Sequence, residues 1–338
     1  MTQQEINELV LNGRFPEDSN QPELLETHIS WVILCDDFVY KIKKPILYSF
    51  LDFSTLEKRK YYCEREIELN KRLTDNIYLD VKTVRKIEGK FVIGGEGGAL
   101  TDYAVRMRKV DRERQMDALL FKNKVTSSDI RNLAEKIAMF HKNATVIYQK
   151  DFLDIQNQFN DLSRERDYLN EHLDKNSTTI ISRAIEISDS FIQKNKALLA
   201  NRLTSGFFRD CHGDLHSRNI FLLPSPQPFD CIEFNDDFRQ IDVLNEVAFL
   251  CMDLYAFSRK DLSDLFLRYY NNLFPSITTD NDRQLFIYYK SYRSNIRANV
   301  NSLRAKSAED YTQRNVALAE VKKYLLLMNP YMALLRNK

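Results

Sequence analysis

One stretch decides how this chain is organised: His212-Gly213-Asp214-Leu215-His216-Ser217-Arg218-Asn219, which stands directly before the apolar run Ile220-Phe221-Leu222-Leu223. A short segment rich in histidine, aspartate and asparagine, set before a strand-like run, is typical of a catalytic loop held by a rigid scaffold. A second polar stretch, Phe229-Asp230-Cys231-Ile232-Glu233-Phe234, follows after a turn. Together the two stretches indicate an active site built on carboxylates and an amide.

The spacing of these groups predicts phosphoryl transfer. Asp214 is followed by four residues and then by Asn219, the spacing of the kinase catalytic loop, in which the aspartate accepts the proton of the attacking hydroxyl and the asparagine binds Mg²⁺. Glu233 follows after a strand-turn-strand interval, where a second metal-binding carboxylate is expected. We therefore predict Asp214 as the catalytic base, and Asn219 and Glu233 as the metal ligands.

The histidines of the loop are expected to support Asp214. His212 is expected to orient the loop through hydrogen bonds to the backbone or to Asp242, which is interpreted as a structural residue. His216 is expected to lie beneath Asp214 or in the cleft. Asp230 is interpreted as a solvated turn residue.

An early β-hairpin supplies a candidate phosphate-binding lysine. Residues 29–34 and 38–42 have the composition of two strands joined by a tight turn. Lys41 and Lys43 share one face of the second strand, because side chains alternate with a period of two. A lysine on an early strand contacts the α- and β-phosphates in kinases. Lys41 fits this role best, with Lys43 as the alternative.

A charged helix is predicted over residues 54–73, with Ser54 as its N-cap and an acidic residue three positions later. In a kinase this helix supplies a glutamate that pairs with the strand lysine. Glu66 is our first choice for that partner, and Glu64 is the second. Because the helix is rich in charge, a solvated charged face is the competing interpretation for either glutamate.

The loop resembles that of the aminoglycoside phosphotransferases and related small-molecule kinases, in which glycine follows the first histidine. The longer run Cys231-Ile232-Glu233-Phe234-Asn235-Asp236, continuing to Ile241-Asp242-Val243, is similar to an uncharacterised bacterial branch of that family, some members of which carry an additional P-loop ATP-binding domain. The resemblance extends from about Glu26 to about Ala305. It implies a protein-kinase-like α+β fold, ATP and Mg²⁺ as cofactors, and transfer of the γ-phosphoryl group to a hydroxyl of a small-molecule acceptor.

The same resemblance implies two lobes. Residues 1–109 are expected to form an N-lobe with a small antiparallel sheet and one main helix, and residues 110–338 a larger, mostly helical C-lobe. Met107 and Val110 are expected to bind the cofactor at a hinge, where adenine stacks on apolar side chains. Because the chain contains no G-x-G-x-x-G loop and no P-loop pattern, the turn at residues 27–30 is expected to cover the phosphates.

The composition excludes several other classes of protein. The 338 residues, 43% apolar and 29% charged, are those of an ordinary soluble protein with room for two domains. A net charge of +1 gives no electrostatic footprint for nucleic acid or a membrane surface. Five cysteines without a C-x-x-C pair indicate a reducing compartment. With no signal-peptide pattern at the N-terminus, we expect a cytoplasmic protein.

The second half of the chain is predicted to be helical, over residues 126–142, 156–173, 178–203, 247–257, 262–273, 281–303 and 308–328. In the sixth of these helices Lys290, Arg293, Arg297 and Arg304 recur on or near one face. Such a basic stripe either attracts an anionic substrate or is solvated, and we expect the second. Glu246 has the position of an acidic residue at a helix N-terminus.

Two other functions compete with an active kinase. His212, Asp214 and His216 form an H-x-D-x-H pattern, which also begins some metallohydrolase sites. Such sites need further ligands, mostly histidines, and the remaining histidines, His28, His141 and His172, do not stand in a ligand pattern. A nucleotide-binding pseudokinase is favoured by the glycine-poor phosphate region and by glutamate in place of aspartate at the second metal position. The intact aspartate and asparagine of the loop favour an active enzyme.

Overall fold

The computed structural model describes residues 1–17, 19 and 21–336, and the chain divides into two compact units. The first unit comprises Met1–Leu119 and Arg218–Phe238, and the second comprises Leu120–Ser217 and Arg239–Lys338. A six-stranded sheet lies in the first unit and most of the helices lie in the second. This confirms the predicted α+β class. The expected lobe boundary after residue 109 stays a prediction.

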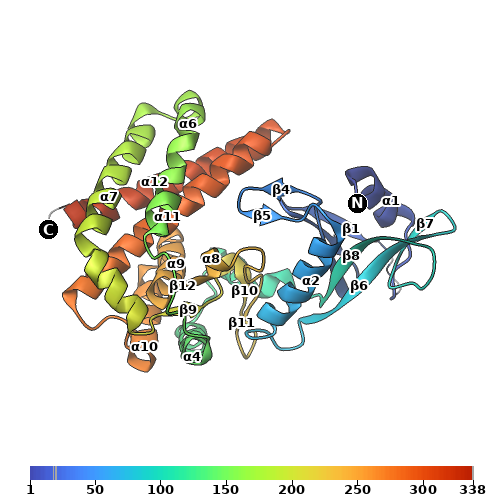
Figure 1. Cartoon of the computed structure of the whole chain (residues 1–338), viewed down its shortest axis with the longest axis horizontal. Coiled ribbons are helices and arrows are strands. Elements are labelled where there is room, and N and C mark those ends of the chain that lie inside the picture. Colours follow the sequence, from blue (N-terminus) through green and yellow to red (C-terminus); the bar gives the residue numbers. More distant parts are fainter. Residues whose placement is uncertain (18, 20, 337–338) are drawn as a thin grey trace. The chain divides into compact units, whose positions relative to one another are not determined.

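The sheet of the first unit is antiparallel throughout, with the order β1-β2-β3-β8-β6-β7. Figure 1 labels β1, β6, β7 and β8 of this sheet. Its strands are β1 (Glu23–Glu26), β2 (Ser30–Leu34), β3 (Phe38–Lys43), β6 (Tyr78–Ile87), β7 (Lys90–Ile93) and β8 (Ala99–Arg108). The predicted hairpin is β2–β3. Sequence reasoning missed β1, because two leucines between glutamates are too short to show alternation. The turn expected to cover phosphates joins β1 to β2.

The two faces of the sheet are covered by different helices. On one face Tyr40 and Ile42 of β3 pack in a core with Ile6 and Leu9 of α1 (Gln3–Asn12). The other face packs against α2 (Leu56–Asn70), mainly along β8 and β6. Because strand side chains alternate, the two lysines of β3 lie on the α2 face.

The N-cap of α2 is Thr55, whose hydroxyl accepts a hydrogen bond from the Lys58 backbone. The prediction of Ser54 was therefore wrong by one residue. Ser54 instead donates from its hydroxyl and its backbone to the carboxylate of Asp52. The two hydroxyl residues are adjacent, so spacing alone did not distinguish them.

The segment after the catalytic loop returns to the first unit. Its short elements are η3 (Ser217–Asn219), β10 (Ile220–Phe221), β11 (Gln227–Pro228) and α8 (Asp236–Arg239). Phe221 and Phe229 stack at a ring-centroid distance of 4.5 Å and pack against an apolar cluster that contains Val105 and the predicted hinge residues Met107 and Val110. The same unit contains the hairpin β4 (Leu47–Tyr48) and β5 (Leu51–Asp52), and η1 (Arg112–Arg114).

The second unit is a helical assembly with one short sheet, in which β9 (Phe208–Asp210) pairs with β12 (Gln240–Asp242). After α3 (Met116–Phe121), the helices are α4 (Ser127–Asn143), α5 (Asp154–Asn160), η2 (Asp161–Glu165), α6 (Arg166–His172), α7 (Lys175–Thr204), α9 (Val243–Ala256), α10 (Lys260–Leu273), α11 (Asp280–Ser307) and α12 (Tyr311–Arg336). None of the described helices is long and apolar enough to cross a bilayer.

The single helix predicted over residues 156–173 is wrong, because that region consists of α5, η2 and α6. Glu165, at the end of η2, is buried and accepts hydrogen bonds from Ser302 at 2.7 Å and from Lys306 at 2.9 Å. Both donors lie on α11, so this contact is between segments far apart in the sequence. Such a contact overrides local helical propensity and leaves no local signal in the sequence.

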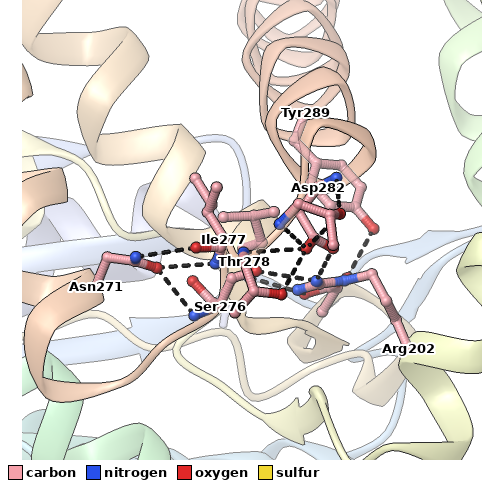
Figure 2. Close-up of polar contacts among 10 residues, drawn as sticks. Arg202, Asn271, Ser276, Ile277, Thr278, Asp282 and Tyr289 are labelled. Atoms are coloured by element: carbon pink, nitrogen blue, oxygen red, sulfur yellow. Dashed lines mark hydrogen bonds and ion pairs between the residues drawn. The ribbon is translucent and has the colours of Figure 1, made fainter.

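A buried arginine braces the short sheet of the second unit (Figure 2). Arg202 of α7 donates to Asp242 at 2.9 Å and to Asp282 at 2.8 Å, and the Tyr289 hydroxyl donates to Asp242 at 3.2 Å. Asn271 closes the same region by accepting from the backbone of Ser276. Asp242 therefore has a structural role, as expected, and fixes β12 beside the strand that leads into the catalytic loop.

Candidate active site

Five charged side chains of the first unit form a continuous chain of ion pairs, here called the ion-pair chain: Asp230, Lys41, Glu66, Lys43 and Glu233. Lys41 Nζ lies 2.7 Å from Asp230 Oδ1 and 2.8 Å from Glu66 Oε1. Lys43 Nζ lies 2.7 Å from Glu66 Oε2 and also contacts Glu233 Oε1. The predicted pair of Lys41 and Glu66 is thus present, and Glu66 binds the alternative lysine as well.

Glu64, the second choice for the helix glutamate, lies elsewhere. Its carboxylate is exposed and 3.6 Å from Lys60, one turn earlier on α2. Such an exposed pair contributes little to stability. Residues 64 and 66 are two positions apart and therefore point to different sides of the helix, and only Glu66 faces the sheet.

Mutual neutralisation keeps the ion-pair chain charged. Burial lowers the pKa of Lys41, but Asp230, Glu66 and Glu233 outweigh burial and hold it well above its ordinary value. Burial raises the pKa of Glu66, but the two lysines outweigh burial and lower it. The pKa of Glu233 is raised, because burial and the nearby Glu66 outweigh the attraction of Lys43. Glu233 is thus the least compensated carboxylate of the buried end.

The two ends of the ion-pair chain differ in exposure. The side chains of Lys41 and Asp230 are 13% and 45% exposed, whereas those of Lys43 and Glu233 are 0% and 4% exposed. Asp230 thus has the exposure expected of a solvated residue, but it also pairs with Lys41, which was not expected. Its backbone is left-handed, with φ of 62°, which aspartate tolerates better than most residues. The sequence gives no signal that Asp230 reaches a lysine 189 positions away.

The first unit also contains the two predicted metal ligands. Lys43 engages only Oε1 of Glu233, and Oε2 has no hydrogen-bond partner among the residues that the structure describes. Asn219 is buried in the same unit, and its backbone carbonyl accepts from Phe229 at 2.9 Å. A free carboxylate oxygen and an amide oxygen are the donors that Mg²⁺ prefers, so these residues fit the ion chemically.

In the second unit a buried carboxylate holds the main chain of the catalytic loop. Glu246, in the first turn of α9, accepts hydrogen bonds from the backbone of His212 at 2.9 Å and of Gly213 at 2.6 Å. His141 Nε2 contacts the same carboxylate at 2.9 Å, and its Nδ1 contacts the Tyr270 hydroxyl at 2.7 Å. Glu246 therefore anchors the loop directly, which its interpretation as a helix N-terminal residue did not predict.

Asp214 itself is flanked by the two histidines of the loop. The backbone N–H of Asp214 donates to His212 Nδ1 at 3.2 Å, so His212 orients the loop through the backbone. His216 is buried against Phe249, with its Nε2 3.3 Å from Asp214 Oδ2. Burial raises the pKa of Asp214, but His216, Arg297 and His212 outweigh burial and hold it well below its usual range. Asp214 is therefore ionised at neutral pH.

Solved structures of other proteins show the same fold. A choline kinase of Cryptosporidium parvum matches with a TM-score of 0.56 at 10% identity, covering 93% of this chain and 90% of that one. An ethanolamine kinase of Plasmodium vivax matches with a TM-score of 0.52 at 11% identity, covering 97% and 87%. The GDP complex of an aminoglycoside 2′-phosphotransferase matches with a TM-score of 0.52 at 13% identity, covering 91% and 92%.

The chain has the protein-kinase-like fold of the small-molecule kinases. This confirms the predicted fold and the resemblance to aminoglycoside phosphotransferases. In sequence, the chain is 31% identical over 292 residues to uncharacterised proteins of Mycobacterium tuberculosis and Mycobacterium bovis. That match covers 83% of this chain and 55% of the mycobacterial proteins, so the chain spans about half of their length. No family model matches the chain.

Within this kinase fold, the basic residues of α11 do not form a solvated stripe, and that expectation was wrong for two of them. Arg293 is buried and donates to the carbonyl of Gly213 at 3.0 Å and to Asn245 at 2.7 Å. Lys290 is buried, with its Nζ 4.5 to 5.1 Å from the centroids of three aromatic rings, those of Tyr255, Phe286 and Tyr331. Arg304 alone of the four is exposed.

The histidine of α4 lies in a possible metal cluster, which the sequence did not indicate. Ligand atoms of His141, Cys211 and Glu246 lie within 4.8 Å of one another. Both ring nitrogens of His141 are already hydrogen-bonded, and Glu246 already holds two backbone N–H groups. None of the three residues of the H-x-D-x-H pattern belongs to this cluster. Glu246 contacts the backbone of His212. The cluster therefore supports the anchoring of the loop better than a metallohydrolase.

Proposed function

We propose that the chain is an ATP- and Mg²⁺-dependent phosphotransferase that transfers the γ-phosphoryl group to a hydroxyl of a small-molecule acceptor. The observation that carries this proposal is the ion pair of Lys41 with Glu66 on a small-molecule kinase fold. That pair marks a competent phosphate-binding strand in kinases. The ionised Asp214, on a loop fixed by Glu246, supports the same function.

In this proposal each predicted residue has one role. Lys41, the accessible lysine, contacts the phosphates, and Glu66 orients it. Met107 and Val110 contact the adenine. Asn219 and Glu233 hold Mg²⁺, which neutralises charge on the phosphates.

The transfer step needs one proton acceptor. The bond between the γ-phosphorus and the β–γ bridging oxygen breaks, and a bond forms from the acceptor oxygen to that phosphorus. The proton of the acceptor hydroxyl moves to Asp214, and ADP leaves. Because Asp214 is ionised and His216 and Arg297 stabilise its charge, its main contribution is to orient the hydroxyl as it attacks.

The fold neighbours support a small hydroxyl compound as the acceptor. Their names specify choline, ethanolamine and aminoglycosides, which are all small alcohols. The overall identities of 10 to 13% do not transfer any one of these substrates to this chain. The small-molecule class is therefore proposed on the fold together with the site residues.

A nucleotide-binding pseudokinase is the second candidate, and one observation favours it. Lys43 already contacts Glu233, so the second metal carboxylate is partly neutralised by the protein itself. A pseudokinase would bind ATP without needing Mg²⁺ and would transfer nothing. The free Oε2 of Glu233 argues for metal binding and therefore for an active enzyme.

The test is ³¹P NMR of the protein with ATP, Mg²⁺ and pools of polyols, amino alcohols, sugars and sugar acids. We expect ADP and a new phosphomonoester resonance with at least one pool, which disappears on chelation of Mg²⁺ and with Asp214→Asn. ATP bound but unchanged with every pool would favour the pseudokinase. Release of inorganic phosphate alone, at the same rate in Asp214→Asn, would contradict the proposed base.

A further inference from the structure

Arg297 of α11 differs from the buried arginines of the chain. Its Nε is buried and has no hydrogen-bond partner, and no carboxylate lies within 4.0 Å of its guanidinium among the described residues. Each of the four arginines that are buried as whole residues donates to a carboxylate or a carbonyl at 3.0 Å or less: Arg59, Arg202, Arg239 and Arg293. Arg297 is thus a half-buried cation without an ion-pair partner.

The surroundings of Arg297 place it near the catalytic loop within the second unit. It lies one helical turn after Arg293, which donates to the carbonyl of Gly213, the residue before Asp214. Its guanidinium carbon lies 5.5 Å from the centroid of the Tyr324 ring. Burial lowers the pKa of Arg297, but Tyr324, Asp214 and Asp253 outweigh burial and raise it.

The acids near Arg297 are engaged by other groups. Asp214 lies 3.3 Å from His216. Asp253 accepts hydrogen bonds from both the backbone and the hydroxyl of Ser217, the backbone bond being 2.8 Å. Arg297 therefore interacts electrostatically with both carboxylates but forms an ion pair with neither.

The Tyr324 side chain hydrogen-bonds the guanidinium of Arg297, but Tyr324 is neutral and Nε has no partner. A partly desolvated guanidinium without a carboxylate costs stability, because it loses bonds to water that a neutral partner replaces only in part. Its planar fork of N–H groups fits the two oxygens of a carboxylate or a phosphate. A buried polar atom without a hydrogen-bond partner calls for an explanation, and a functional role is one of those that native structures show. The charge and the fork geometry of Arg297 fit an oxyanion that is not part of the chain.

We propose that Arg297 binds an oxyanion, a carboxylate or a phosphate group, close to Asp214, and that this group belongs to the acceptor. The second part rests on the proposed function, in which Asp214 receives the proton of the acceptor hydroxyl. The acceptor is then a hydroxy acid or a phosphorylated alcohol. A polycationic acceptor such as an aminoglycoside is disfavoured, because Arg297 repels it.

The test is calorimetric titration of inorganic phosphate into the intact protein, Arg297→Gln and Arg304→Gln. Arg304 lies on the same helix but is exposed, so its variant is the matched control. We expect Arg297→Gln to weaken phosphate binding about ten- to hundred-fold, the range for charge-assisted hydrogen bonds, and Arg304→Gln to leave it unchanged. Equal affinity in all three proteins, or no binding by the wild type, would overturn the proposal.

Two further measurements separate the alternatives. With a non-hydrolysable ATP analogue and Mg²⁺ present, phosphate should still bind; its displacement would overturn the assignment to the acceptor and give Arg297 to the transferred phosphate. The thermal midpoint of Arg297→Gln should be unchanged or higher, and a fall of several degrees would identify Arg297 as a structural counter-ion instead. If ATP itself fails to bind while phosphate binds through Arg297, the proposed function fails and the oxyanion site stands.

Discussion

The ion-pair chain of the first unit and the catalytic loop of the second are held by different kinds of contact. In the ion-pair chain, side chains bind side chains: Lys41 bridges two carboxylates, and so does Lys43. In the loop, side chains bind main chain: Glu246 accepts from the backbone N–H of Gly213, and Arg293 donates to its carbonyl. Both the backbone N–H and the carbonyl of Gly213 are thus hydrogen-bonded to buried charged side chains.

The difference corresponds to what each region has to do. A lysine paired with a carboxylate can exchange that partner for a phosphate when a nucleotide binds. A peptide group held by buried charges cannot move without breaking strong hydrogen bonds, and the base that follows it stays in place. The comparison therefore predicts that changes in the loop affect turnover and stability, that changes at the exposed end of the ion-pair chain affect binding, and that changes at its buried end affect stability as well.

The largest expected effect is that of Asp214→Asn. Turnover should fall about a hundred- to ten-thousand-fold, the usual contribution of a positioned base, while the affinity for ATP stays within about twofold of the wild type. Steady-state rates and ATP titration check this. Asp264→Asn, on an exposed part of α10, is the control and should keep full turnover; equal turnover in Asp214→Asn would remove Asp214 from the mechanism.

Glu246→Gln should lower the stability of the protein, because it weakens the hydrogen bonds that hold the loop. The amide keeps one acceptor oxygen but places N–H groups against the backbone donors of His212 and Gly213, so we expect a loss of about 3 kcal/mol in unfolding free energy and a lower turnover. Denaturant unfolding measures it. Glu171→Gln, on an exposed position of α6, should change nothing, and an equally small effect at Glu246 would contradict the anchoring role.

The effect of Glu246→Gln on stability should also depend on pH. Burial raises the pKa of Glu246, but His141, His212 and the Gly213 backbone outweigh burial and lower it to about 2. A carboxyl whose folded pKa lies below its unfolded value of about 4.3 stabilises the fold above that pH, and this stabilisation is lost as the pH falls towards 2. The stability difference between wild type and Glu246→Gln should therefore shrink between about pH 4.5 and pH 2. A difference that is constant over this range would mean that the Glu246 charge is not involved.

Lys41→Met and Lys43→Met should separate the two lysines of β3. Lys41→Met should weaken ATP binding about tenfold, through loss of a charge-assisted phosphate contact, with little change in thermal midpoint. Lys43→Met leaves buried Glu66 and Glu233 undercompensated, so it should lower the midpoint and weaken the dependence of ATP binding on Mg²⁺. Lys44→Met is the control, since Lys44 pairs with Glu26 outside the ion-pair chain. Identical effects of Lys41→Met and Lys43→Met would show that the two lysines have no separate roles.

The sequence predicted the parts of the site whose spacing is local. The interval from Asp214 to Asn219, the alternation that puts Lys41 and Lys43 on one face, and the helix that contains Glu66 are all visible in short windows. The hairpin β2–β3 and most helices of the second unit were predicted for the same reason. The periodicity of apolar residues was sufficient to predict a helix or strand wherever that element buries one face.

Contacts between distant segments left no such signal. Asp230 reaches Lys41 across 189 positions, and Glu246 reaches the loop across 33 or 34. Arg293 was expected to be solvated because its helix is rich in basic residues, yet its partners lie on other elements. The pairing of buried charges is decided by tertiary packing, and only the structure shows which charges meet.

The most direct test of the central claim is calorimetric titration of ATP with and without Mg²⁺, on the intact protein and on Glu233→Ala. A Mg²⁺-dependent phosphotransferase predicts that Mg²⁺ tightens ATP binding and that Glu233→Ala abolishes most of this gain. Equal ATP affinity with and without Mg²⁺ in the wild type would contradict the claim and favour the pseudokinase, and no ATP binding at all would exclude both.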